Sequence, residues 1–168
     1  LPELIAQAVG RFGRLDALVN NASAFYPTPI GGTVPAQWDE LFASNARAPF
    51  FLSQAAVPHL RKARGAIVNL VDVYAERPLA EHTLYCMAKA ALAMMTLSLA
   101  KELGPEIRVN AVAPGAVLWP EQGKAQAEQD AMIAGTALQR AGTPEDVAEA
   151  VRWLLQDAHY TTGQVLRV

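Results

Sequence analysis

The sequence predicts an α/β fold of the doubly wound type, in which a parallel sheet carries helices on both faces. Short apolar stretches alternate with longer segments of helical pattern, and the apolar stretches end in polar or turn-forming residues. This alternation favours parallel strands joined by right-handed helical crossovers. The chain has 168 residues, of which 52% are hydrophobic, so it can bury a core, and we expect residues 1–168 to form a single domain.

The expected elements are, in chain order, helix 2–12, a strand from residue 17, helix 38–64, strand 66–71, helix 83–103, strand 107–112, a helix from residue 144 and strand 164–168. Gly13 ends the first helix and Gly65 separates helix 38–64 from the next strand. Pro49 and Pro58 lie inside helix 38–64, and we expect them to kink or break it.

The later elements have local boundary signals. Gly104-Pro105 ends helix 83–103. Thr143-Pro144-Glu145-Asp146 combines a capping threonine, a proline at the first helical position and acids near the positive end of the helix. The polar segment 120–136 is expected to be either a lid over a substrate or an exposed helix.

Tyr85 stands four residues before Lys89 in helix 83–103, and Asp72 directly follows strand 66–71. Positions four apart lie on one face of a helix, so the Lys89 ammonium is expected to lower the pKa of the Tyr85 phenol. A phenol with a lowered pKa can exchange protons near neutral pH. The three residues therefore indicate a proton donor, a group that tunes it and a helper.

Three strand ends carry polar or turn-forming residues. Asn20 closes the first strand, Asp72 follows the second, and Pro114-Gly115 follows the third. Ligands of open parallel sheets bind just beyond the carboxyl ends of the strands. These residues are thus expected to border one binding site.

Taken in order and spacing, these motifs resemble those of the short-chain dehydrogenase/reductase family from Leu1 to Val168. The resemblance implies a Rossmann-like fold. Four motifs carry the resemblance. Asn20-Asn21-Ala22-Ser23 is similar to the family's Asn-Asn-Ala-Gly turn, and Asn45 is similar to its helix asparagine. Tyr85 and Lys89 are similar to its catalytic pair, and Pro114-Gly115 is similar to its turn beside the nicotinamide.

Two departures narrow the resemblance to pteridine reductases. Most members of the family carry serine where this chain has Asp72, and glycine where it has Ser23. The run from Asn21 to Pro29 resembles the pteridine reductase loop whose aromatic ring stacks on the pterin, which would be Phe25 here. The resemblance implies hydride transfer from NADPH to a C=N bond of a pterin of the dihydrobiopterin or dihydrofolate type.

In that mechanism Tyr85 would donate the proton, and Lys89 would hold the nicotinamide ribose and stabilise the phenolate. Asn45 would anchor a water chain that returns the proton through Lys89, and Asp72 would share or relay the proton. The implied cofactor-binding residues are Asn20, Ala22, Ser23, Tyr85, Lys89, Pro114 and Gly115. The implied substrate-binding residues are Ser23, Phe25, Asp72, Tyr85 and Trp119.

Some of these residues also have structural interpretations. Phe25 could be loop packing, Asp72 a helix cap or turn residue, and Trp119 part of the core. His82, three residues before Tyr85, is interpreted as a surface, packing or pocket-rim residue.

The family's glycine-rich turn, which binds the dinucleotide pyrophosphate after the first strand, has no counterpart in this sequence. Gly31-Gly32 lies in a loop, and Gly10 and Gly13 belong to the end of a helix. We therefore expect the chain to be the C-terminal two thirds of the fold, incomplete at the N-terminus. The residues present do not distinguish NADH from NADPH, and NADPH rests on the resemblance.

Composition argues against several classes of partner. A net charge of −2 and a pI near 5.9 give no basic surface for nucleic acid. The longest apolar stretch, residues 88–100, is interrupted by Lys89 and is expected to be a buried helix rather than a membrane span. The single cysteine, Cys86, and the absence of a signal peptide favour the cytoplasm, and no residue spacing indicates a metal site.

Two other functions remain open. The first is a reductase of the same family that acts on a ketone, a sugar or an acyl thioester. The second is a cofactor-free module that only makes subunit contacts. In either case the resemblance implies a homo-oligomer, a dimer or tetramer, formed through helices 38–64 and 83–103.

Overall fold

The computed structural model describes residues 1–117 and 126–168. Within these residues four parallel strands form one sheet in the order β1-β2-β3-β4. The register pairs Asn20 with Asn69 and Leu70 with Val112, so the carboxyl ends of β1, β2 and β3 lie at one edge. The strands are β1 (Ala17–Asn20), β2 (Ala66–Leu70), β3 (Arg108–Ala113) and β4 (Val165–Arg167).

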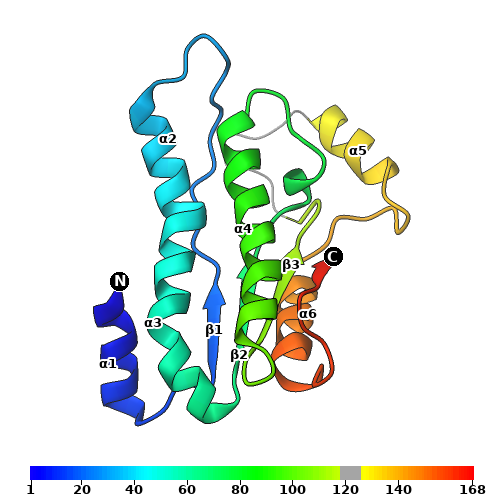
Figure 1. Ribbon diagram of the computed structural model, residues 1–168. Coiled ribbons are helices and arrows are strands. Elements are labelled where there is room, and N and C mark those ends of the chain that lie inside the picture. The colour runs from blue at the N-terminus through cyan, green and yellow to red at the C-terminus, as the bar shows by residue number, and fades with distance from the viewer. Residues whose placement is uncertain (118–125) are drawn as a thin grey trace.

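Helices connect these strands, and Figure 1 shows their arrangement. They are α1 (Pro2–Phe12), α2 (Pro35–Phe42), α3 (Ala48–Ala63), α4 (Thr83–Leu103), α5 (Gln126–Ala134) and α6 (Pro144–Gln156), with a π-helical turn η1 (Ala43–Arg47) and a 3₁₀ turn η2 (Val73–Ala75). Part of the polar segment 120–136 therefore forms α5, while residues 120–125 lie outside the described residues.

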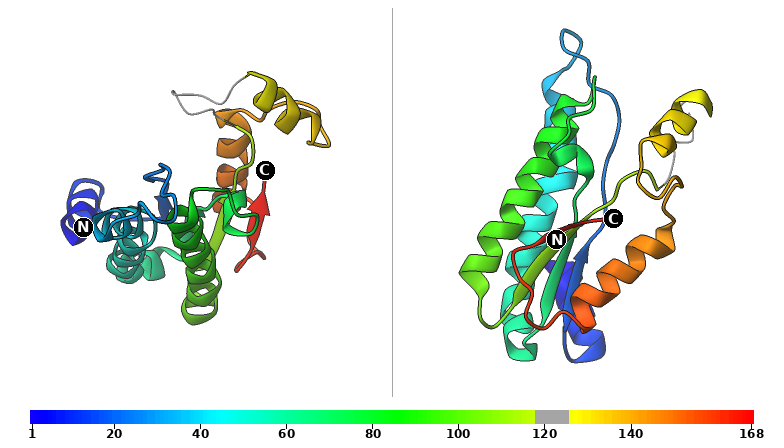
Figure 2. Two further views of the ribbon diagram at one scale, coloured as in Figure 1. Left: turned by 90° about the horizontal axis from the view of Figure 1, so that it is seen from above. Right: turned by 90° about the vertical axis from the view of Figure 1, so that its right-hand side faces the viewer.

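Helices cover both faces of the sheet, as the sequence predicted. On one face, Ile67 of β2 packs in a cluster with Leu60 of α3 and Leu103 of α4. On the other face, Val68 of β2 packs with Leu154 of α6. Figure 2 shows α4 and α6 on opposite sides of the strands. Neighbouring residues of β2 thus point into two separate cores, as the period of a strand requires.

The predicted helix 38–64 corresponds to α2, η1 and α3, which follow one another without a gap from Pro35 to Ala63. Helical structure begins earlier, at Pro35, because proline suits the first helical position. The interruption lies at η1 rather than at a proline. Pro49 lies in the first turn of α3, two residues after η1, and Pro58 lies inside α3 without ending it.

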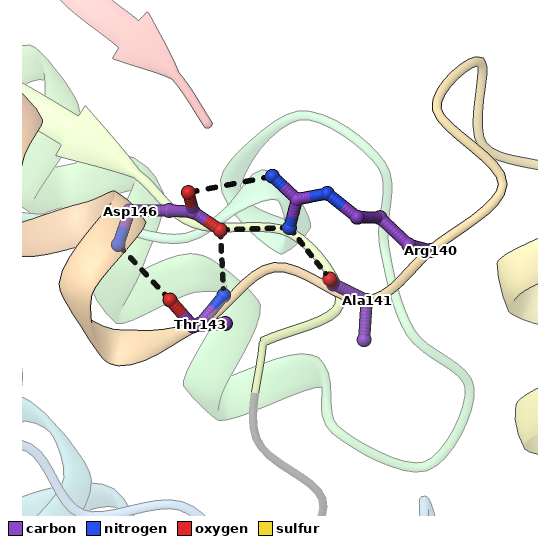
Figure 3. A network of polar contacts seen from close by, with 4 residues as sticks. All are labelled: Arg140, Ala141, Thr143 and Asp146. Carbon is purple, nitrogen blue, oxygen red and sulfur yellow. Dashed lines mark hydrogen bonds and ion pairs between the residues drawn. The ribbon is translucent and has the colours of Figure 1, made fainter.

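The start of α6 is fixed by the predicted capping residues (Figure 3). The Asp146 N–H donates to Thr143 Oγ1 at 3.2 Å, and the Thr143 N–H donates to Asp146 Oδ2 at 2.9 Å. Arg140 donates to the same carboxylate at 2.8 Å. The hydrogen bond from Arg140 holds the pKa of Asp146 below its usual range. These contacts join the loop after α5 to the helix that covers β2.

A buried polar network joins the sheet to α3 and α4. Asn20 Nδ2 donates to Asn69 Oδ1 at 2.8 Å, and Asn69 Nδ2 donates to Thr96 Oγ1 at 2.9 Å. Asn20 Nδ2 also lies 3.4 Å from Ser53 Oγ. Asn20 Oδ1 is buried and has no hydrogen-bond partner among the described residues. The network fixes the end of β1 relative to β2.

By length and composition alone, α4 is the one helix in the described part of the chain that could cross a membrane. It packs against β3 and η2, and it buries residues along its length, among them the charged Lys89. These contacts are those of a helix packed into the core of the fold.

Gly65 provides a test of the packing beneath β2. A Cβ atom at this position would overlap the carbonyl oxygen of Asp16, and a side-chain carbon of Leu60 lies 2.9 Å from the same point. We expect Gly65→Ala to lower the free energy of unfolding by about 1–3 kcal/mol, because the backbone must shift to admit the methyl group. Chemical denaturation measures the change.

Gly10→Ala is the matched control. A Cβ atom there meets nothing within 4 Å, and the position lies inside α1. This control should raise stability by about 0.5–1 kcal/mol, since alanine is the better helix former. Equal stability of Gly65→Ala and the wild-type protein would contradict the packing described here.

Candidate active site

Tyr85 and Lys89 lie in the first half of α4, beside the carboxyl end of β2. The Tyr85 hydroxyl donates to Asp72 Oδ2 at 2.7 Å, and Lys89 Nζ donates to the Leu70 carbonyl at 2.9 Å. Lys89 Nζ lies 5.7 Å from the centre of the Tyr85 ring. The structure therefore brings together the tyrosine, the lysine and the aspartate that the sequence singled out.

Asp72 has two partners at once. Its Oδ1 accepts the Tyr74 N–H at 2.9 Å and so caps η2, while its Oδ2 accepts from Tyr85. The capping interpretation and the active-site interpretation are thus both compatible with the geometry. The cap orients the carboxylate, because rotation of the side chain would break the bond to the Tyr74 N–H.

The expected lowering of the Tyr85 pKa is not found. The pKa of Tyr85 is raised well above its usual value, first by burial and then by the negative charge and hydrogen bond of Asp72, while the Ser23 hydroxyl acts in the opposite direction. Spacing on the helix correctly placed Lys89 near Tyr85, but it carried no information on burial or on the distance to Asp72. These two effects decide the direction of the shift.

Burial affects Lys89 in the opposite sense, since it disfavours the ammonium. It lowers the pKa of Lys89 to about 8, and the carboxylate of Asp72 opposes this shift. Only 3% of the residue's surface is exposed. An ammonium carries three N–H donors, and the Leu70 carbonyl is its one hydrogen-bond acceptor within the described residues. Lys89 can therefore donate further hydrogen bonds to a ligand.

Asn45 is fully buried in η1, next to the turn after β1. Asn45 Nδ2 donates to the carbonyls of Leu41 and Ala24 at 2.9 Å each, and Asn45 Oδ1 accepts from Ser23 Oγ at 2.6 Å. The polar atoms of its side chain are thus engaged with the protein. An amide oxygen can accept two hydrogen bonds, so Ser23 leaves Asn45 Oδ1 one further acceptor position, and the water chain from Asn45 to Lys89 stays a prediction.

Phe25 lies beside the N-terminal start of α4. Its ring stacks on His82 with the centroids 4.7 Å apart, and it meets Tyr85 edge to face at 4.8 Å. A hydrogen bond of 2.5 Å from the Thr28 N–H to the Glu81 carbonyl holds the loop against the turn before α4. Phe25 remains 41% exposed, so part of its ring is available to a ligand.

A pocket of about 790 Å³ opens at the carboxyl edge of the sheet. The predicted site residues that line it are Ser23, Asp72, Tyr85, Lys89, Pro114 and Gly115. Those that do not line it are Asn20, Ala22, Phe25 and Asn45. Asn20 instead belongs to the buried polar network, and its cofactor contact stays a prediction. Trp119 lies outside the described residues.

Sequence reasoning missed one wall of this pocket. It is formed by α6, which contributes Pro144, Val147, Ala148, Val151, Arg152, Leu155 and Gln156. The capping residues predicted where α6 begins, but not that side chains of this helix line the pocket. The described residues contain no group of three or more His, Cys, Asp or Glu that could hold a metal ion.

Comparison with known proteins places these features in a family. A family profile described as "Enoyl-(Acyl carrier protein) reductase" matches residues 1–168. The chain is 38% identical to granaticin polyketide synthase putative ketoacyl reductase 2 of Streptomyces violaceoruber, over 98% of this chain and 69% of that protein. It is 37% identical to pteridine reductase 1 of Leishmania tarentolae, over 94% of this chain and 62% of that protein.

The fold is also similar to a solved structure. Acetoin dehydrogenase YohF from Salmonella typhimurium superposes with a TM-score of 0.86 and 35% identity, over 99% of this chain and 68% of that one. The chain thus spans about two thirds of the length of these relatives. On the profile match and these identities, the chain belongs to the short-chain dehydrogenase/reductase family.

Proposed function

We propose that the protein containing this chain reduces a pterin with NADPH, with Tyr85 as the proton donor. The observation that carries this proposal is the hydrogen bond of 2.7 Å from the Tyr85 hydroxyl to the Asp72 carboxylate, in a pocket that Lys89 also lines. A proton donor needs a protonated hydroxyl at the working pH, and the raised pKa of Tyr85 provides it.

The residues present fit the nicotinamide end of such a cofactor. Lys89 has N–H donors beyond its bond to Leu70, and a pair of ribose hydroxyls would accept them. Pro114 and Gly115 line the same pocket, and the Gly115 N–H bonds to the Val168 carbonyl at 2.8 Å, which holds their turn against β4. NADPH supplies the hydride when it is bound.

Tyr85 and Asp72 would act as a unit on the proton. The carboxylate holds the hydroxyl proton along a charge-assisted hydrogen bond, and a ring nitrogen of the substrate would replace it as the acceptor. Lys89 has a pKa of about 8 and is mainly protonated at pH 7. Its ammonium would therefore stabilise the negative charge left on Tyr85. A serine in place of Asp72 would offer only a neutral acceptor.

An aromatic side chain beside Tyr85 favours a planar heterocycle as the substrate. Phe25 lies edge to face with Tyr85 and stays partly exposed, and a flat aromatic ligand could stack on such a ring. The similarity to a pteridine reductase supports the same choice. A ketone substrate is the second candidate, because the similarity to a ketoacyl reductase is equally high.

We also infer that the protein forms a homo-oligomer through α3 and α4. Both helices expose large apolar side chains, whose burial against a second copy would be favourable. They are Phe50 and Phe51 on α3 and Met87, Met94 and Leu97 on α4, each 41–63% exposed. The positions 87, 94 and 97 follow the spacing of one helix face.

The substrate proposal is tested with the longest form of the protein that its gene encodes. We expect it to oxidise NADPH with dihydrobiopterin and not with simple ketones, followed by absorbance of the reduced cofactor. Tyr85→Phe should reduce the rate by about 10²–10⁴-fold, since it removes the proton donor. Equal turnover of ketones would reject the pterin in favour of the second candidate.

Asp72→Ser tests the carboxylate. We expect the kcat for the pterin to fall about 10- to 100-fold while the KM for NADPH stays near that of the wild-type protein. A second measurement is independent of turnover. The Asp72 charge raises the pKa of Lys89, so the substitution should move the Lys89 midpoint below its wild-type value of about 8, followed by NMR of the labelled lysine. An unmoved midpoint together with full turnover would exclude the role given to Asp72.

Met94→Glu tests the assembly. It places a charge on the exposed α4 face at a residue that is 63% exposed, so it should lower the molecular mass measured by light scattering. Leu4→Glu on α1, at a residue 58% exposed, is the matched control and should leave the mass unchanged. A monomeric wild-type protein would refute the inferred contact.

A further inference from the structure

His82 is the N-cap residue of α4, three residues before Tyr85, and it is held at both its backbone and its side chain. The His82 N–H donates to the Leu79 carbonyl at 3.3 Å, and the His82 carbonyl accepts the Cys86 N–H at 3.0 Å. Its ring Nδ1 lies 2.8 Å from the Ala80 carbonyl oxygen. A carbonyl oxygen only accepts hydrogen bonds, so Nδ1 carries a proton and donates it. The imidazole ring therefore has a fixed place at the start of the helix.

Phe25 lies against this fixed ring. The two rings are stacked, with their centroids 4.7 Å apart and their planes inclined by 16°. The second ring contact of Phe25 is the edge-to-face contact with Tyr85. A phenyl ring has no hydrogen-bonding group, so contacts of this kind set its orientation. The stack on His82 thus holds the Phe25 ring beside α4.

The held ring stands at the border of the candidate site. Tyr85 lines the pocket at the carboxyl edge of the sheet, whereas Phe25 and His82 do not. Phe25 is 41% exposed although it contacts both other rings. A planar ligand that reaches Tyr85 can stack on the exposed part of Phe25, and the area of this contact depends on how the phenyl ring is oriented.

We propose that His82 is a positioning residue for the substrate, because its fixed ring holds Phe25 in the orientation in which a planar heterocycle can stack on it. In this role His82 touches neither substrate nor cofactor and takes no part in proton transfer. The inference rests on the proposed function in taking a planar heterocycle as the substrate. It adds to the site a residue that the motifs left outside it.

Two other roles for His82 would lead to different results. A histidine that bound the substrate through its second ring nitrogen could be replaced by a polar side chain, but not by phenylalanine. A histidine that only closed the helix would affect stability without a selective effect on the substrate. As the stacking partner of Phe25, His82 should be replaceable by another flat ring, but not by a polar side chain without a ring.

The first measurement is the affinity for dihydrobiopterin in the presence of NADP⁺, which has no hydride to deliver. It uses calorimetry and the longest form of the protein that its gene encodes. We expect His82→Gln to weaken binding about 2- to 10-fold, as the loss of one aromatic stacking contact would, and His82→Phe to bind like the wild-type protein. In turnover, His82→Gln should raise the KM for the pterin while kcat and the KM for NADPH stay nearly constant.

His159→Gln is the matched control. His159 is exposed and lies in the turn after α6, so its replacement should leave the affinity unchanged. Wild-type affinity in His82→Gln would overturn the inference, and so would a phenylalanine variant that binds as weakly as the glutamine variant.

A double-variant cycle tests whether His82 acts through Phe25. Phe25→Leu alone should weaken binding at least as much as His82→Gln does. Adding His82→Gln to Phe25→Leu should then weaken binding no further, because the ring that His82 holds is already gone. Losses that add in the double variant would contradict the inference.

A measurement without ligand keeps this result separate from the substrate test. The ring current of His82 shields the stacked Phe25 ring, whose NMR signals in protein with labelled phenylalanine are identified by their loss in Phe25→Leu. These signals should move downfield in His82→Gln and remain shielded in His82→Phe. Unmoved signals in His82→Gln would overturn the inference. Moved signals in a protein that does not bind or reduce pterins would refute the proposed substrate and leave the hold of His82 on Phe25 standing.

Discussion

The parallel register of β1, β2 and β3 is the constraint on which the site depends. It aligns Asn20 with Asn69 and Leu70 with Val112, so three separate stretches of chain leave the sheet at one edge. A slip of one residue in β2 would exchange Ile67 and Val68 between the two cores and would turn Asp72 away from Tyr85. The buried amides of Asn20 and Asn69 add a polar contact that only this register satisfies.

The position of Lys89 is costly to the fold. Its pKa of about 8 lies below the value of 10.5 for an unperturbed lysine, so between about pH 8 and 10.5 the unfolded chain binds more protons than the folded one. The contribution of Lys89 to stability therefore rises with pH across this window and is least favourable below it. A lysine kept in such a place at neutral pH is consistent with a functional role, because a hydrophobic side chain would pack there without this cost.

Much of the fold could be predicted from the sequence, because its signals are local. Gly13 after α1, Thr143 before α6 and the apolar runs of β2 and β3 each mark an element by its own residues. The π-turn around Asn45 was not predicted, because the expected interruptions of this helix were placed at its prolines. Motifs also indicated Tyr85, Lys89 and Asp72 as neighbours. The direction of the Tyr85 pKa shift and the α6 wall of the pocket depend on burial and distance in three dimensions, which spacing along the chain does not determine.

The π-turn η1 has one more consequence. A π-turn holds an extra residue compared with an α-helical turn. In this protein, the irregularity faces Asn45 toward Ser23, while α3 beyond it presents Phe50 and Phe51 to the outside. Deleting a single residue between 43 and 47 would restore a regular helix and keep the phase of α3, because one residue fewer in a regular α-helical turn covers nearly the same rotation. Such a deletion would withdraw the Asn45 oxygen from Ser23 while the outward face of α3 stayed in place. The inner chemistry of this segment could therefore change during evolution without a change of its outer surface.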